Sequence, residues 1–267
     1  MTTAEQPPPN VAPSRPSIAR IYDHWLGGKD NYAVDRREAE SLEAVVPELP
    51  LIARQNRDFH RRAVGHLATA GVTQFLDLGA GLPTASNTHE IAQAANPQAR
   101  VAYVDNDPVV LAHGRALLAS GTNTVMVEAD LRDPRAVFDH PDVTGLLDFT
   151  RPVAVLLVSV LHFVPGQEPY RIVREIRDRL VPGSHIVISH GLRTPQTTRA
   201  AAKYQAADAE VRTREQISAL FNGLELIEPG LVHLTDWRPD TPAPNTEPLP
   251  FLCGVGVLGK TDQTEAT

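Results

Sequence analysis

The residues with the clearest capacity for chemistry form a glycine-rich turn, Phe75-Leu-Asp-Leu-Gly-Ala-Gly-Leu-Pro-Thr84. The turn follows an apolar run typical of a strand and precedes a helical pattern. Gly79 and Gly81 permit positive φ and a close approach of the backbone to a ligand. The third glycine of the dinucleotide fingerprint is absent, and the carboxylate of Asp77 would repel a pyrophosphate. The turn therefore favours a cationic ligand, unless Asp77 only accepts hydrogen bonds from backbone N–H groups.

Two more carboxylates follow the next two predicted strands. Asp105 ends Val101-Ala-Tyr-Val-Asp105, close to the spacing of about 20 residues expected for an acidic residue that binds ribose. Asp130 ends the third run and has the right chemistry to accept from an adenine amino group, although alone it is equally typical of a turn. The following Asp107 is expected to cap a helix. Three carboxylates at successive strand ends are a more specific pattern, because ligands of open α/β sheets bind at those ends.

The elements that must position these groups alternate along the chain. Apolar runs predict strands at 74–78, 100–105, 124–129, 153–158 and 185–189, and helical patterns between them lie at 88–95, 109–120, 135–140 and 169–180. Helices at 17–26, 35–46 and 51–70 are expected before the sheet. After it we expect a helix at 214–221, with Thr213 and Gln216 as a capping box, and strands at 224–227, 231–235 and 251–258. This order predicts an α/β, doubly wound parallel sheet with an antiparallel last strand.

These motifs, with the opening segment Ser17-Ile-Ala-Arg-Ile-Tyr-Asp-His-Trp-Leu-Gly-Gly-Lys-Asp-Asn-Tyr32 and the segments 155–164 and 229–239, resemble the class I S-adenosylmethionine-dependent methyltransferases. The similarity is greatest to an actinomycete family of uncharacterised methyltransferases and covers about residues 16–260. It implies a Rossmann-like sheet of seven strands, the last antiparallel, and S-adenosyl-L-methionine as cofactor. We expect a helical cap or lid at 17–72, a cofactor-binding core at 73–260, and disordered tails at 1–16 and 261–267.

The resemblance also implies roles for single residues. The methionine part would be held by Asp77, Gly79 and Gly81, the ribose by Asp105 beside Asn106, and the adenine by Asp130 and Leu131, while Ser159 would line the sulfonium end and Tyr22 with the 28–32 turn would form a lid. The fourth strand does not end in the Asn/Asp-Pro-Pro-Tyr motif of nucleic-acid amino methyltransferases.

A general base is needed only if the methyl acceptor must lose a proton, and His162 is our candidate because imidazole titrates near neutral pH. The alternative is a histidine packed against the sheet. His190 is a second candidate, and His185 is expected to face a helix. Near the N-terminus, Ile18 and Trp25 are expected in the core. Cationic side chains there would suit an anionic acceptor, although a solvated helix face is the more typical interpretation: Arg20, Lys29, Arg36 and Arg37.

Composition restricts the remaining functions. The net charge of −7 argues against a broad nucleic-acid surface, and no run reaches the ~18 apolar residues of a membrane span. The single cysteine, Cys253, and the absence of a signal-peptide pattern favour a cytoplasmic protein, and we expect no metal site. The predicted partner is a small-molecule methyl acceptor. The alternatives are a non-catalytic S-adenosylmethionine-binding regulator and an NAD-dependent oxidoreductase; the sequence does not indicate the oligomeric state.

Overall fold

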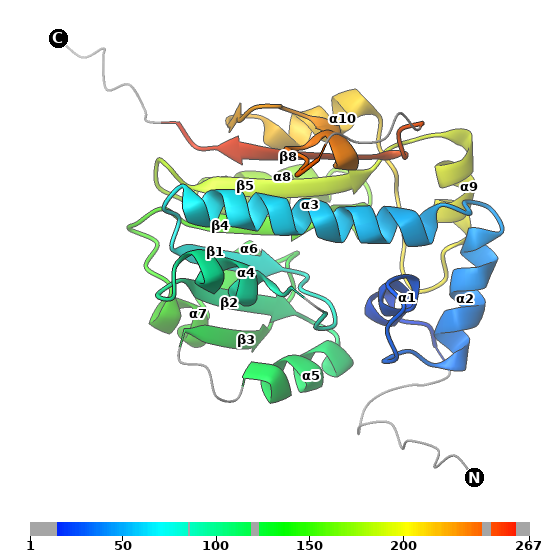
Figure 1. Cartoon of the computed structure of the whole chain (residues 1–267), viewed down its shortest axis with the longest axis horizontal. Helices are drawn as coiled ribbons and strands as arrows, with labels where there is room; N and C mark the ends of the chain where they lie inside the picture. The colour runs from blue at the N-terminus through cyan, green and yellow to red at the C-terminus, as the bar shows by residue number, and fades with distance from the viewer. Residues whose placement is uncertain (1–14, 85, 119–122, 242–246, 260–267) are drawn as a thin grey trace.

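The computed structural model describes residues 15–84, 86–118, 123–241 and 247–259 (Figure 1). Within them one mixed sheet has the strand order β3-β2-β1-β4-β5-β8-β6, and β7 pairs with β8 beside this path. The strands are β1 (Gln74–Leu78), β2 (Arg100–Asp105), β3 (Thr124–Glu128), β4 (Ala154–Val158), β5 (His185–Gly191), β6 (Glu225–Leu226), β7 (Val232–His233) and β8 (Phe251–Val257). The predicted doubly wound sheet is confirmed: β1 to β5 are parallel, and β8 runs antiparallel to β5, β6 and β7. The described sheet has eight strands instead of seven, because the two-residue β7 adds to β8.

Helices surround this sheet. They are α1 (Ile18–Trp25), α2 (Ala33–Glu43), α3 (Leu49–Thr69), α4 (Thr88–Ala95), α5 (Pro108–Leu118), α6 (Pro134–Phe138), α7 (Pro141–Leu146), α8 (Glu168–Arg177), α9 (Pro195–Lys203) and α10 (Arg214–Ser218), with short 3-10 turns η1 (Leu161–Phe163), η2 (Ala219–Phe221) and η3 (Leu234–Asp236). The predicted capping box of α10 is present, since the Thr213 side chain accepts from Gln216 N and the Gln216 side chain accepts from Thr213 N.

Both faces of the sheet are buried, as the continuous apolar runs of its strands require. Alternate residues of β1 point to opposite sides: Phe75 lies in the core that includes Phe59 of α3, whereas Leu76 lies in the core that includes Ile172 of α8. Helix α3 runs along one face of the sheet in Figure 1. It therefore belongs to the core that covers the sheet. Of the helices in the predicted 17–72 cap, only α1 and α2 lie where a cap would.

Helices α1 and α2 lie beyond the carboxyl ends of the parallel strands (Figure 1). A buried ion pair joins them, with Arg20 Nε 2.8 Å from Asp35 Oδ2. Asp35 also accepts from the backbone N–H groups of Ser17 and Tyr32. The interpretation of Arg20 as a solvated cation is wrong, because this side chain is only 4% exposed and holds the two helices together.

Helices α7 and α9 were not predicted. Helix α9 is polar and Ala-rich, so it lacks the apolar stripe that revealed the other helices. It begins at a capping box instead, in which Thr194 and Thr197 satisfy each other's backbone N–H groups and Pro195 occupies the first turn. Of the predicted disordered tails, 1–14 and 261–267 lie outside the described residues. Arg15 is described, and its carbonyl accepts from the Arg20 guanidinium.

Candidate active site

A cavity of about 520 Å³ lies at the carboxyl ends of β1 to β4 and is covered by α1 and α3. Every residue predicted to bind the cofactor lines it: Tyr22, Asp77, Gly79, Gly81, Asp105, Asn106, Asp130, Leu131 and Ser159. The sheet brings them together because parallel strands end at one edge. Their proximity is established by the fold, whereas their roles toward a ligand remain predictions.

The glycine turn fits tightly against the turn after β4. Gly79 has φ +73° and Gly81 has φ +68°, a region that side-chain-bearing residues rarely adopt. A Cβ on Gly79 would lie 2.6 Å from Val160 Cγ2, whereas one on Gly81 would meet no atom within 4 Å. Gly79 is therefore required for packing as well as conformation, while Gly81 leaves open space at the cavity.

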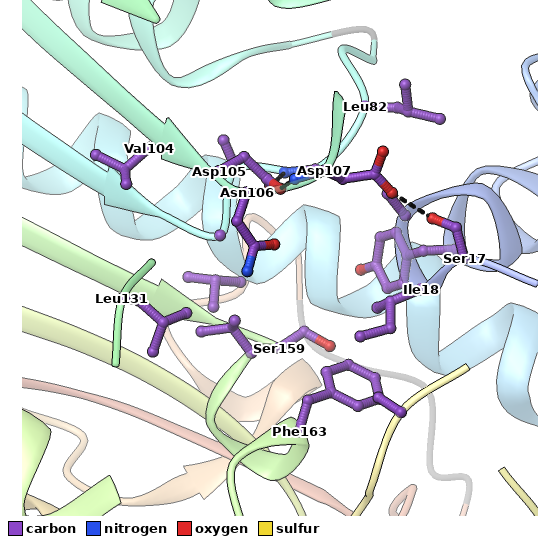
Figure 2. Close-up of a pocket in the computed structure, with 18 of the residues that line it drawn as sticks. Ser17, Ile18, Leu82, Val104, Asp105, Asn106, Asp107, Leu131, Ser159 and Phe163 are labelled. Atoms are coloured by element: carbon purple, nitrogen blue, oxygen red, sulfur yellow. Dashed lines mark hydrogen bonds between the residues drawn. The ribbon is translucent and has the colours of Figure 1, made fainter. Parts of the chain in front are cut away.

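Asp105 fixes the geometry of its own turn. Its Oδ2 accepts from Gly81 N at 2.9 Å and its Oδ1 accepts from Asp107 N at 2.9 Å. Asp107 caps α5, as predicted, by accepting from Val109 N, and its other oxygen accepts from the Ser17 hydroxyl at 2.6 Å (Figure 2). Burial raises the pKa of Asp105, which favours a ligand that can stabilise the carboxylate. The Ser17 contact links α1 to the β2 end.

Asp77 is 8% exposed, and its Oδ2 accepts from the Thr88 hydroxyl at 2.6 Å. Burial raises the pKa of Asp77 to about 6, against an ordinary value of 3.8. Thr88 Oγ1 also lies 2.8 Å from His60 Nε2. Since the Thr88 proton is donated to Asp77, His60 must donate from Nε2, which leaves Nδ1 as an unprotonated nitrogen with no partner among the described residues. Asp77 is thus oriented by a chain of side-chain hydrogen bonds through Thr88 and His60. The alternative, in which Asp77 only accepts from backbone N–H groups, is not what the structure shows.

A second hydrogen-bond chain joins α1 to the end of β4. The Tyr22 hydroxyl donates to Ala53 O at 3.1 Å and accepts from Asn56 Nδ2 at 2.9 Å. Asn56 Oδ1 accepts from the Ser189 hydroxyl at 2.6 Å, and Ser189 Oγ accepts from Ser159 N at 2.9 Å. Ser159 has φ +59°, a strained conformation for a non-glycine residue. The chain holds this strained turn at the cavity.

The cavity is strongly acidic. Its carboxylates are Asp23, Asp77, Asp105, Asp107 and Asp130, and its guanidinium groups are Arg57 and Arg132. Arg132 is already paired with Asp130, whose pKa its hydrogen bonds lower. His60 adds no charge at neutral pH, since burial places its pKa well below the ordinary value. The excess of carboxylates suits a cationic ligand.

His162 does not line the cavity. Its ring packs 4.3 Å from Phe163, 5.5 Å from His190 and 5.7 Å from Phe251 between ring centroids. Burial, with the nearby His190 and Arg212, places the His162 pKa well below its ordinary value. The structure therefore gives no support to His162 as a base at this cavity. The 3-10 turn η1 directs Phe163 to the cavity in its place.

His190 is also directed away from the cavity lining. Its Nε2 lies 2.9 Å from Arg212 Nη1, an obligate donor, so Nε2 accepts and Nδ1–H donates to Gly191 O at 2.9 Å. Burial lowers the His190 pKa to about 3. His190 is consequently a neutral, structural histidine. His185 is likewise outside the cavity lining, and burial lowers its pKa to about 4.

The structure changes the interpretation of the N-terminal segment. Ile18, expected in the core, lines the cavity with Tyr22, whereas Trp25 is buried as predicted. The 28–32 turn does not line it. Instead Asp23 Oδ2 accepts from Asp30 N at 2.9 Å and from Asn31 Nδ2 at 2.8 Å, which folds this turn against α1.

Several cavity residues were missed by sequence reasoning. Asn56, Arg57 and His60 of α3 line the cavity, as do Phe163 and Ala206. The polar residues Asn56 and His60 are one helical turn apart on the face that also carries Phe59, and both are buried. A polar residue on an otherwise apolar helix face needs a hydrogen-bond partner when it is buried. This pattern was the signal in the sequence that could have identified Asn56 and His60.

The described residues contain no group of three His, Cys, Asp or Glu side chains placed to hold a metal ion. None of the helices in the described ranges is long and apolar enough to cross a membrane.

Comparison with known proteins matches residues 4–259 to the model of a family described as S-adenosyl methyltransferase. A methyltransferase candidate from Thermobifida fusca is 44% identical, with 96% of this chain and 100% of that chain covered and a TM-score of 0.92. A DUF574 family protein from Streptomyces avermitilis is 39% identical, with 91% and 98% covered and a TM-score of 0.87.

An O-methyltransferase family protein from Burkholderia thailandensis, 15% identical with 89% of this chain and 64% of that chain covered and a TM-score of 0.53, shares the fold. No curated protein sequence matches this chain significantly. The predicted resemblance to an actinomycete methyltransferase family is confirmed. The chain belongs to the S-adenosyl methyltransferase family and is a methyltransferase of the class I fold.

Proposed function

We propose that the cavity binds S-adenosyl-L-methionine and that the protein transfers its methyl group to a small-molecule acceptor. The observation that carries the proposal is the acidic cavity itself, in which carboxylates from the ends of β1, β2 and β3 surround the glycine turn. A ligand with an ammonium and a sulfonium group fits this charge, whereas the pyrophosphate of NAD does not.

The residues present fit the cofactor in kind. Asp77 and the turn of Gly79 and Gly81 would hold the methionine part, with Arg57 as the cation for its carboxylate. Asp105 and Asn106 would hold the ribose, and Asp130 with Leu131 the adenine. Each carboxylate already has a fixed orientation from its own hydrogen bonds, so little reordering accompanies binding.

When bound, S-adenosylmethionine supplies a methyl group already activated by its sulfonium. The residues of the cavity would then have to orient an acceptor lone pair toward that methyl group and exclude water. Helix α1 closes one side of the cavity through the Ser17–Asp107 and Tyr22–Asn56 hydrogen bonds and would exclude water. His162 does not line the cavity, so it is not positioned to accept a proton from the acceptor. We expect the methyl transfer to happen in the cytoplasm.

Isothermal titration calorimetry tests this proposal. S-adenosylmethionine and S-adenosylhomocysteine should bind, with the charged sulfonium form favoured at low salt, and NAD should show no comparable heat. Tight NAD binding without a response to either sulfur compound would overturn the assignment. Cofactor binding without methyl transfer to any member of a metabolite library would favour the alternative, a non-catalytic S-adenosylmethionine-binding regulator.

A further inference from the structure

The cavity has two chemically different halves. The ends of β1, β2 and β3 form an acidic half, which contains Asp77, Asp105 and Asp130. The opposite half is formed by α1, the turn after β4 and the segment after α9. Its lining side chains are mostly apolar: Ile18, Ala19, Leu26, Phe163, Val164 and Ala206. Asp23 of α1 also lines the cavity, and its Oδ2 already accepts from Asp30 N and Asn31 Nδ2. The proposed cofactor accounts for the acidic half only, so the apolar half is left for the methyl acceptor.

Neither guanidinium of the cavity is available in the apolar half. Arg132 is paired with Asp130, and Arg57 donates to Ser86 O and lies close enough to Asp77 to lower its pKa. The cations that the sequence suggested for an anionic acceptor are also engaged or distant: Arg20 is paired with Asp35, and Arg36 donates to Asn31. An anionic acceptor would therefore enter an apolar surface beside carboxylates without a compensating charge.

Ser159 supplies a polar atom at the boundary between the halves. Figure 2 shows it between Leu131, on the acidic side, and Phe163, on the apolar side, with Ile18 near Phe163. Its N–H is held by Ser189 Oγ, whereas its own hydroxyl makes no hydrogen bond within the described residues. The hydrogen bonds of its N–H to Ser189 hold the backbone of this turn at a φ of +59°. Persistent strain of this kind is typical of residues that act on a ligand.

We infer that the methyl acceptor is a small, uncharged, aromatic-sized molecule. Its ring lies against Phe163 and Ile18, and the polar atom that receives the methyl group hydrogen-bonds to the Ser159 hydroxyl. The inference rests on the proposed function, because it assigns the acidic half to the cofactor. A flat ring suits the space, since Ala19, Ala206 and Ala207 line it with short side chains while the Tyr22 ring is fixed by two hydrogen bonds.

The test measures binding of matched probes to the protein saturated with S-adenosylhomocysteine. The probes are phenol and aniline, both uncharged at pH 7.5, benzoate as the anion and benzylamine as the cation, followed by ligand-observed NMR. Phenol and aniline should bind at least tenfold more tightly than benzoate and should compete with each other. Equal or tighter binding of benzoate or benzylamine, or no binding of the uncharged pair, would overturn the inference.

The variant Ser159→Gly removes the hydroxyl and also relieves the positive φ, so the fold is retained. It should weaken phenol binding to the protein saturated with S-adenosylhomocysteine about threefold to tenfold, as for a neutral hydrogen bond. Ser86→Gly is the matched control, because Ser86 has φ +68° and its side chain is exposed away from the cavity. Phenol binding unaffected by Ser159→Gly would remove Ser159 from the acceptor site. Failure of S-adenosylhomocysteine itself to bind would identify the proposed function, and not only the acceptor class, as wrong.

Discussion

The variant Asp77→Asn separates the effect of this buried carboxylate on the free energy of unfolding from its effect on cofactor affinity. Burial holds the pKa of Asp77 at about 6 instead of 3.8, so ionisation opposes folding. A raised carboxyl pKa contributes stability that is present below pH 3.8 and is lost as the pH rises through 6. A difference of about two pKa units corresponds to about 3 kcal/mol. The ligand-free protein is therefore less stable at pH 8 than at low pH by about this free energy of unfolding.

The variant should therefore be more stable than the wild type without ligand at pH 8, by up to about 3 kcal/mol. The gain is an upper bound, because the new amide N–H₂ needs a partner in a buried place. The difference should shrink as the pH falls toward 4, where Asp77 is protonated. Urea unfolding at pH 8 and pH 5 measures both values.

Cofactor affinity should change in the opposite direction. Loss of the carboxylate removes a charge-assisted contact worth about 1.5–3 kcal/mol, which calorimetry with S-adenosylmethionine would detect as weaker binding. Asp139→Asn is the control: this surface carboxylate is paired with Arg179, which holds its pKa low, so its removal should slightly destabilise the protein at pH 8 and leave binding unchanged. A stability difference between the Asp77 variant and the wild type that is the same at pH 5 and pH 8, or a variant that binds S-adenosylmethionine as tightly as the wild type, would refute the reasoning.

Three further predictions concern the turns and the cap of the same cavity. Gly79→Ala should cost about 1–3 kcal/mol more than Gly81→Ala in urea unfolding, because its Cβ overlaps Val160 while that of Gly81 meets open space; equal costs would contradict the packing argument. Asp105→Ala should weaken S-adenosylhomocysteine binding by about 1.5–3 kcal/mol per charged hydrogen bond lost, in a variant whose circular dichroism is unchanged; an unaltered Kd would exclude the residue from the site. If residues 17–32 act as a lid, they should gain protection from hydrogen exchange when S-adenosylhomocysteine binds. An exchange rate that is the same with and without the ligand would show that the segment is purely structural.

The acidic half of the site could be predicted from the sequence because the ends of buried strands can be recognised in it. Asp77, Asp105 and Asp130 each follow a buried apolar run, and a parallel sheet must bring such ends to one edge. No knowledge of side-chain orientation was needed. The same reasoning produced the sheet and its antiparallel last strand, because alternating strand and helix patterns leave few other arrangements.

The other half of the cavity depends on orientations that the sequence does not encode locally. One residue of register in η1 decides whether His162 or Phe163 faces the cavity, and a three-residue turn has no periodicity that could reveal it. Asn56 of α3 is 133 residues away in the sequence from its partner Ser189 of β5. Ile18 looked like a core residue since apolar cavity walls and apolar cores share the same pattern.

The structure of the protein crystallised with S-adenosylhomocysteine tests the central claim most directly. The account predicts the ligand in the cavity at the carboxyl ends of β1 to β4, with its amino group near Asp77, its ribose at Asp105 and its adenine beside Leu131, and with the apolar half next to Phe163 left open. Ligand bound elsewhere, or bound with the adenine at Asp77 and the amino acid part at Leu131, would contradict it.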